Sequence, residues 1–101
     1  MKLLIIIAVL DFEKDIKQML KKVQVKTFTY KEVKSFTDLS EEAIESNWFA
    51  TDIAETESIL FYAFVKKDNI DPLFELVTEF NLKQETASKI HVAVLNIEKS
   101  N

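Results

Sequence analysis

The 101-residue sequence lacks glycine, cysteine and arginine altogether, and it has only one proline and one histidine. Without cysteine the chain has no disulfides, no thiolate metal sites and no cysteine nucleophile. Without arginine it lacks the side chain best suited to bidentate phosphate and guanine contacts, so we expect no nucleic-acid binding. Without glycine there is no glycine-rich phosphate loop, and turns that need a positive φ are expected to use Asn or Asp, or to be replaced by longer loops.

The length and the ordinary globular composition predict one folded domain, residues 1–101. The run from Leu3 to Leu10 is apolar but far too short to cross a bilayer. Acidic residues follow it at once, with no small-residue cleavage site of the kind that ends a signal peptide. We therefore interpret the run as a buried strand and expect a cytoplasmic protein without membrane insertion.

The pattern of elements predicts an α+β fold. Strands are expected over residues 3–10, 25–37, 59–65 and 90–97. Asp11 is expected to cap the helix between the first two strands, and Asp71 with Pro72 to begin the helix before the last strand. Two strand-helix-strand units with right-handed crossovers give a ferredoxin-like βαββαβ sandwich, an antiparallel sheet with both helices on one face.

Two of the predicted strands are apolar on both faces, Leu3 to Val9 and Ile59 to Val65. A chain of this size can cover one face of its sheet with its own helices. We therefore expect the other face to meet another copy of the chain.

The segment 38–57 carries seven acidic residues and no lysine, so its charge is −7 while the rest of the chain carries +3. It is predicted to be a long loop between the two central strands. Oxygen ligands suit hard cations, but the segment lacks the spacing and the glycine of a calcium loop, which favours solvated charge over metal binding. Within it, Trp48 and Phe49 either anchor a partner protein or fold back on the domain's own core.

Few residues offer catalytic chemistry. His91 is the only histidine, and with no companion ligand it is interpreted as an ordinary strand residue rather than a metal ligand or a general base. We therefore predict no enzymatic activity and no metal site. Lys83, Ser88 and Lys89 lie in a polar connection, which either receives an anion or is simply a solvated loop.

The string Phe28 to Phe36, FTYKEVKSF, resembles the PII signalling family. Members carry a T-x-T-E-V-K-G-F-like string just before a long loop, at the corresponding place in the same order of elements. Here Ser35 replaces the family's glycine. The letters that match are Thr29, Glu32, Val33, Lys34 and Phe36.

The resemblance implies a homotrimer that binds a small ligand, in family members commonly an adenine nucleotide, in clefts between subunits. It implies that Thr29, Lys34 and Phe36 lie at the base of the long loop. Lys89 matches the lysine that ends the family's glycine-rich phosphate loop, although residues 81–89 here contain no glycine. With Lys83 and Ser88, these residues are the expected ligand-binding set, for a nucleotide or another small anion.

The hypothesis is a non-enzymatic regulatory, signal-transduction protein of the PII-like type. It would form a homotrimer and dock on a partner protein through loop 38–57, with Trp48 and Phe49 as the anchors. By family analogy that partner is a membrane transporter. The alternative is a module that handles divalent metals and resembles the CutA-type proteins, which share the trimeric ferredoxin-like plan.

Overall fold

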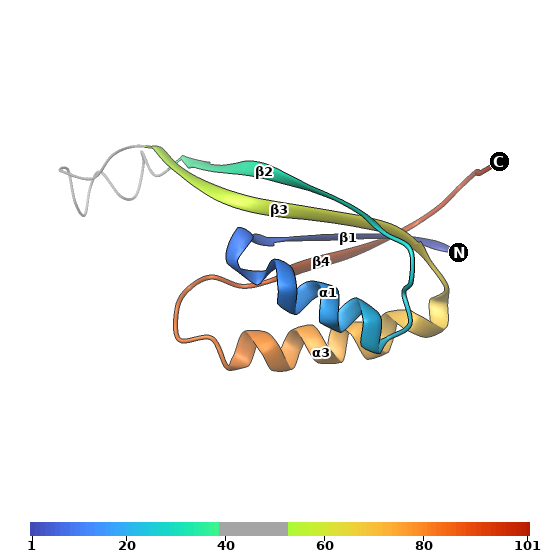
Figure 1. The fold of residues 1–101 in the computed structure, drawn as a ribbon. Coiled ribbons are helices and arrows are strands. Elements are labelled where there is room, and N and C mark those ends of the chain that lie inside the picture. Colours follow the sequence, from blue (N-terminus) through green and yellow to red (C-terminus); the bar gives the residue numbers. More distant parts are fainter. Residues whose placement is uncertain (39–52) are drawn as a thin grey trace.

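The computed structural model describes residues 1–38 and 53–101. Two helices lie along one face of a four-stranded sheet, as Figure 1 shows. The short 3-10 turns η1 (Leu10–Phe12) and η2 (Lys67–Asn69) lead into the two helices. The strands and helices are β1 (Lys2–Val9), α1 (Glu13–Lys22), β2 (Thr29–Asp38), β3 (Ile53–Val65), α3 (Ile70–Leu82) and β4 (His91–Asn96).

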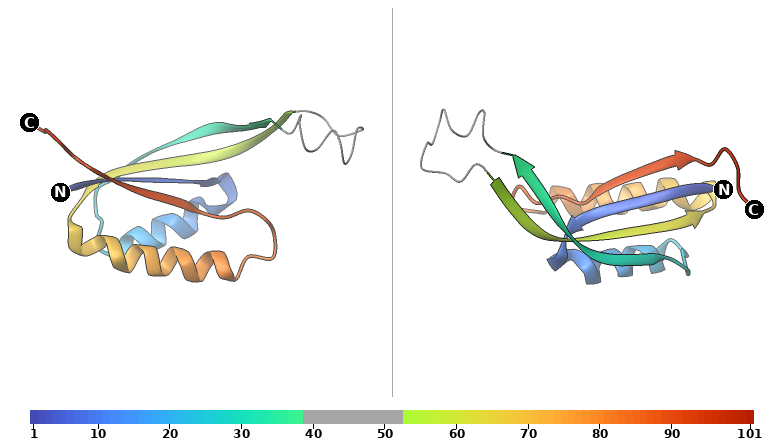
Figure 2. Two further views of the ribbon diagram at one scale, coloured as in Figure 1. Left: turned by 180° about the vertical axis from the view of Figure 1, so that it is seen from behind. Right: turned by 90° about the horizontal axis from the view of Figure 1, so that it is seen from above.

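The sheet order is β2-β3-β1-β4 and every neighbouring pair is antiparallel (Figure 2). β1 lies at the centre, paired with β3 from Lys2↔Val65 to Val9↔Ser58 and with β4 on its other side. This order and the position of both helices confirm the predicted ferredoxin-like sandwich.

The core lies between the sheet and the helices. Alternate residues of β1 point into it, so Leu4 and Ile6 are almost completely buried while their neighbours are half-buried. The helices contribute the inner stripe of each amphipathic pattern. The largest fully buried side chains are Phe61, Leu4, Ile6, Ile16, Leu20, Ile59 and Leu73.

The opposite face of the sheet, here called the open face, is also apolar. Its β1 residues are half-buried, and Tyr62, Phe64 and Leu95 are exposed on the flanking strands, Phe64 by 60%. Among the described residues no helix covers this face (Figure 1). The prediction of strands that are apolar on both sides is therefore confirmed for β1 and β3.

Both helices begin differently from the prediction. Asp11 lies inside η1, and α1 starts at Glu13 without a side-chain cap. Asp71 lies in the first turn of α3, whose N-cap residue is Asn69. In each case a 3-10 turn precedes the helix, so the chain turns before it reaches the position expected for the cap. The carboxylates still stand near the positive end of each helix, where they are favourable.

The strand boundaries also differ. β2 begins at Thr29 rather than at residue 25, because the residues before it close a turn at the end of α1. β3 begins at Ile53, so residues 53–57, expected in the long loop, are strand. They pair with β2, and this places Lys34 opposite Glu57, a favourable cross-strand combination of charges. Trp48 and Phe49 lie outside the described residues.

The end of α1 shows how this chain makes a tight turn without glycine. Gln24 has φ 64°, the left-handed conformation. Its N–H donates to the carbonyl of Lys21 at 3.0 Å, and the N–H of Val25 donates to that of Leu20 at 2.9 Å. These two bonds form a Schellman motif, completed by the buried side chains of Val25 and Leu20. The expectation of Asn or Asp at such a turn is wrong here, since Gln24 occupies it.

Candidate functional site

A pocket of about 310 Å³ lies near the end of the paired strands β2 and β3 that borders residues 39–52. We call it the basal pocket. Its walls come from the end of β1, from the outer parts of β2 and β3, and from the connection that enters β4. The polar residues that line it are Ser35, Thr37, Thr56, Ser58, Ser88, Lys89 and His91.

The lining of the basal pocket has a marked chemical bias. Beside the apolar side chains of Ile7, Ala8, Val9 and Ala87, it presents hydroxyl groups, one ammonium group and one imidazole, and no Asp or Glu is among the described residues that line it. Glu55 and Glu57 alternate with Thr56 and Ser58 along β3, so the pleat directs them to the helix side of the sheet. A pocket of donors without carboxylates suits an anionic ligand.

Ser58 is the least accessible polar group of the pocket. Its residue is only 3% exposed, since Val33 and Val9 flank it on the neighbouring strands. The hydroxyl donates to the carbonyl of Thr56 at 3.4 Å, a long hydrogen bond. The Ser58 oxygen therefore keeps most of its capacity for a better partner.

Lys89 lines the pocket but its ammonium group is already engaged. The Lys89 Nζ donates to the backbone carbonyl of Asn81, in the last turn of α3, at 2.8 Å. The Asn81 side chain in turn donates from Nδ2 to the carbonyl of Ile90 at 2.9 Å and accepts the Ile90 N–H at Oδ1 at 2.8 Å. These three bonds fasten the start of β4 to α3 and so position Ser88 and Lys89.

The structure brings together only part of the expected ligand-binding set. Ser88 and Lys89 meet in the basal pocket. Lys34 and Phe36 do not line it, because they alternate with Ser35 and Thr37 and lie on the helix side of β2.

Thr29 lies at the opposite end of β2, paired with Tyr62. It is six residues from Ser35, which corresponds to about 20 Å of strand. Within one chain Thr29 therefore cannot reach the basal pocket.

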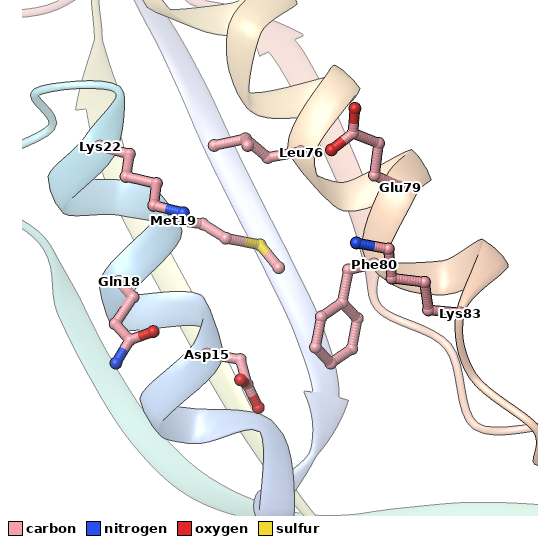
Figure 3. A pocket seen from close by; sticks show the side chains of 8 residues that line it. All are labelled: Asp15, Gln18, Met19, Lys22, Leu76, Glu79, Phe80 and Lys83. Atoms are coloured by element: carbon pink, nitrogen blue, oxygen red, sulfur yellow. The ribbon is translucent and has the colours of Figure 1, made fainter.

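Lys83 belongs to a different hollow, between the two helices. This groove of about 190 Å³ has Met19, Leu76 and Phe80 at its centre, and Figure 3 shows the charged side chains around it. Its rim combines opposite charges from both helices: Asp15, Lys22, Glu79 and Lys83. Lys83 thus does not join Ser88 and Lys89 in a common site.

Sequence reasoning missed Ser35, Thr37, Thr56 and Ser58. The period-2 alternation around Lys34 and Phe36 was the available signal, since it assigns the intervening residues to the other face. The register with β3 and the nearness of Ser88 arise only from the folded chain.

Two further properties bear on function. The described part of the chain contains no group of three or more His, Asp or Glu residues placed to hold a metal ion. Within that part, no helix has the length and apolar character needed to cross a membrane.

Neither a protein-family model nor a curated protein matches the chain, but solved structures are similar to it. One is CPII, a nitrogen regulatory PII-like protein from Thiomonas intermedia K12, bound to ADP, AMP and bicarbonate. Its sequence is 16% identical, the alignment covers 99% of this chain and 94% of CPII, and the TM-score is 0.63. Another is the GlnK-ATP complex of B. subtilis, with 19% identity, coverage of 93% and 80%, and a TM-score of 0.67. At these identities the similarity establishes a shared fold over nearly the whole chain.

Proposed function

Since the chain has the fold of PII-like proteins, we propose that it is a non-enzymatic regulatory protein of that type, with a small anionic ligand in the basal pocket. The observation that carries this proposal is the pocket lining itself. Hydroxyl groups of β2 and β3 gather around Ser88 and Lys89, and none of the described lining residues has a carboxylate. Similar structures bind ADP, AMP or ATP, which makes an adenine nucleotide the first ligand to test.

The phosphate groups of such a ligand would be held by side chains. Residues 81–89 contain no glycine, and their Cβ atoms hinder the close approach of backbone amides to a phosphate. In the proposal, side-chain hydroxyls take the place of these amides, because each can donate to a phosphate oxygen. They are the hydroxyls of Ser35, Thr37, Thr56 and Ser88.

We further propose that the open face is the subunit interface of a homotrimer. Exposed aromatic side chains such as Tyr62 and Phe64 gain most from burial against another copy. Thr29 lies beside Tyr62 on this face. Its proposed role in ligand binding therefore requires that it reach the basal pocket of a neighbouring subunit, which places the ligand between subunits.

The geometry suggests how a ligand signal is passed on. Thr37 and Thr56 line the basal pocket and lie on the two strands that enter residues 39–52. In this proposal, a ligand that binds both residues favours one arrangement of β2 and β3 at the point where they enter residues 39–52. In this proposal Trp48 and Phe49 dock on a partner protein, for which a membrane transporter is the candidate.

The test combines native mass spectrometry with calorimetric titration of ATP, ADP and AMP into the purified protein. We expect a trimer with saturable binding, and about tenfold weaker binding in Ser88→Ala and in Thr37→Val, since each loses a hydrogen bond to a charged group. Thr27→Val, an exposed position outside the basal pocket, is the matched control and should bind normally.

A monomer that binds none of these nucleotides would contradict the proposal. Equal nucleotide affinities in the parent protein and all variants would show that the basal pocket is not the binding site. Saturable binding of divalent metal ions, with no nucleotide binding, would favour the CutA-like alternative instead.

A further inference from the structure

A second ligand-sized hollow lies at the opposite end of β2 from the basal pocket. It has a volume of about 530 Å³ and lies between the C-terminal half of α1 and the segment that leads into β2. Figure 2 shows α1 running beneath this side of the sheet, next to β2. We call it the lateral pocket. Its lining residues, none of which lines the basal pocket, are Lys17, Lys21, Gln24, Val25, Lys26 and Phe28.

The inner wall of the lateral pocket is apolar and aromatic. Val25 is buried and Phe28 is half-buried. The Phe28 ring lies 5.6 Å from that of Phe61 and 6.1 Å from that of Tyr30, and the last two rings stack at 5.4 Å. Phe28 is thus fixed in a cluster of three aromatic rings. Such a wall favours a flat apolar group, because aromatic rings pack well edge-to-face or offset.

The rim of the lateral pocket carries charge of one sign. The Lys17 Nζ donates to the Glu13 carboxylate at 2.8 Å and lies 4.1 Å from the centre of the Tyr30 ring. The hydrogen bond to Glu13 raises the pKa of Lys17, which therefore keeps its proton. Lys17–Glu13 is the one ion pair within the described residues, so the exposed ammonium groups of Lys21 and Lys26 are uncompensated there.

The end of α1 does not oppose an anion at this rim as strongly as a bare helix end would. Free carbonyls at a helix C-terminus repel negative charge. Here the Schellman motif occupies them, since the carbonyls of Leu20 and Lys21 accept from Val25 and Gln24. The Met19 carbonyl accepts from the N–H of Val23. The positive side chains therefore dominate the local field.

We propose that the lateral pocket binds a small aromatic carboxylate, with its ring against Phe28 and Val25 and its carboxylate between Lys21 and Lys26. The two halves of the pocket match the two halves of such a ligand. A neutral aromatic molecule would leave the ammonium groups unused, and an inorganic anion would leave the apolar wall exposed. This site is independent of the function proposed for the basal pocket.

The probe is 2-naphthoate, and its matched control ligand is the neutral 2-naphthalenemethanol. Calorimetry is combined with NMR shifts of ¹³C-labelled Val methyl groups in the full chain. We expect one naphthoate per chain, shifts centred on Val25, and at least fivefold weaker binding of the alcohol. The double variant Lys21→Gln/Lys26→Gln should bind naphthoate about tenfold more weakly, because it loses two charge contacts at the rim.

The matched control is Lys14→Gln/Lys99→Gln, which removes the same charge from exposed positions outside the lateral pocket. Its affinity should equal that of the parent protein, as should that of Ser88→Ala in the basal pocket. Any of four results would overturn the proposal. The acid and the alcohol could bind equally well, or both double lysine variants could lose the same affinity for naphthoate. The NMR shifts could be centred on the open face, or no shift could be seen at all. Circular dichroism of each variant checks that it keeps the fold of the parent protein.

Discussion

Gln24 offers the sharpest test of how this glycine-free chain is built, because replacing it by glycine should stabilise the protein. A residue with a Cβ atom costs roughly 1–2 kcal/mol in the left-handed conformation. Gln24 holds that conformation at φ 64°, and the Schellman bonds of α1 depend on it. Glycine removes this cost but adds about 0.4–1 kcal/mol of chain entropy to the unfolded state. Gln24→Gly should therefore raise the free energy of unfolding by about 0.5–1 kcal/mol.

The matched control is Gln18→Gly, which introduces the same residue at an exposed position inside α1. There the φ is helical and glycine should lower the free energy of unfolding by about 1 kcal/mol. Urea unfolding at a fixed protein concentration gives both values, with an unchanged m-value showing that the unfolded state is the same. The reasoning fails if Gln24→Gly is no more stable than the parent protein while Gln18→Gly is destabilised as expected.

Three further predictions address the interface, the α3–β4 fastening and a surface charge. Phe64→Glu should convert the proposed trimer to smaller species in sedimentation velocity, whereas Leu82→Glu, which changes an even more exposed residue on α3, should not. Asn81→Ala should lower the free energy of unfolding by about 2–3 kcal/mol in urea, because it removes two hydrogen bonds at once. Glu13→Gln should lower the pKa of Lys17 in an NMR titration, because the hydrogen bond that raises it is lost. Any stabilisation from that raised pKa is fully present at neutral pH and disappears only as the pH rises through it.

The fold followed from the sequence because its signals are local and repeated. Alternate residues of β1 such as Leu4 and Ile6 are apolar, and so are those between them, which identified a strand with two apolar sides. The helix boundaries were less accurate. Nothing in Asp11 or Asp71 shows that a 3-10 turn precedes each helix, because the same carboxylate is favourable at the cap and in the first turn.

The basal pocket was found only in part, and the reason is geometric. Ser88 and Lys89 were predicted to bind a ligand because they lie in a polar connection and because Lys89 matches a lysine of the family. On β2 the resemblance identified Lys34 and Phe36, whose letters match, whereas the pocket uses Ser35 and Thr37 between them. Letter matching carries no information about which face of a strand a residue occupies, and only the pairing of β2 with β3 decides it.

The position of Lys89 suggests which groups bear most of the ligand binding. Its ammonium group is bonded to the Asn81 carbonyl at 2.8 Å, so contact with an anion would have to replace or share that bond. The side-chain bonds between Asn81 and Ile90 would still hold β4 to α3, so the site tolerates such an exchange. When Lys89 exchanges the Asn81 carbonyl for an anion, the binding free energy gains only the difference between the two hydrogen bonds. A hydroxyl without a good partner, such as that of Ser58, contributes the full free energy of a new hydrogen bond. In this pocket the hydroxyls should therefore contribute more to affinity than the lysine that the sequence singles out.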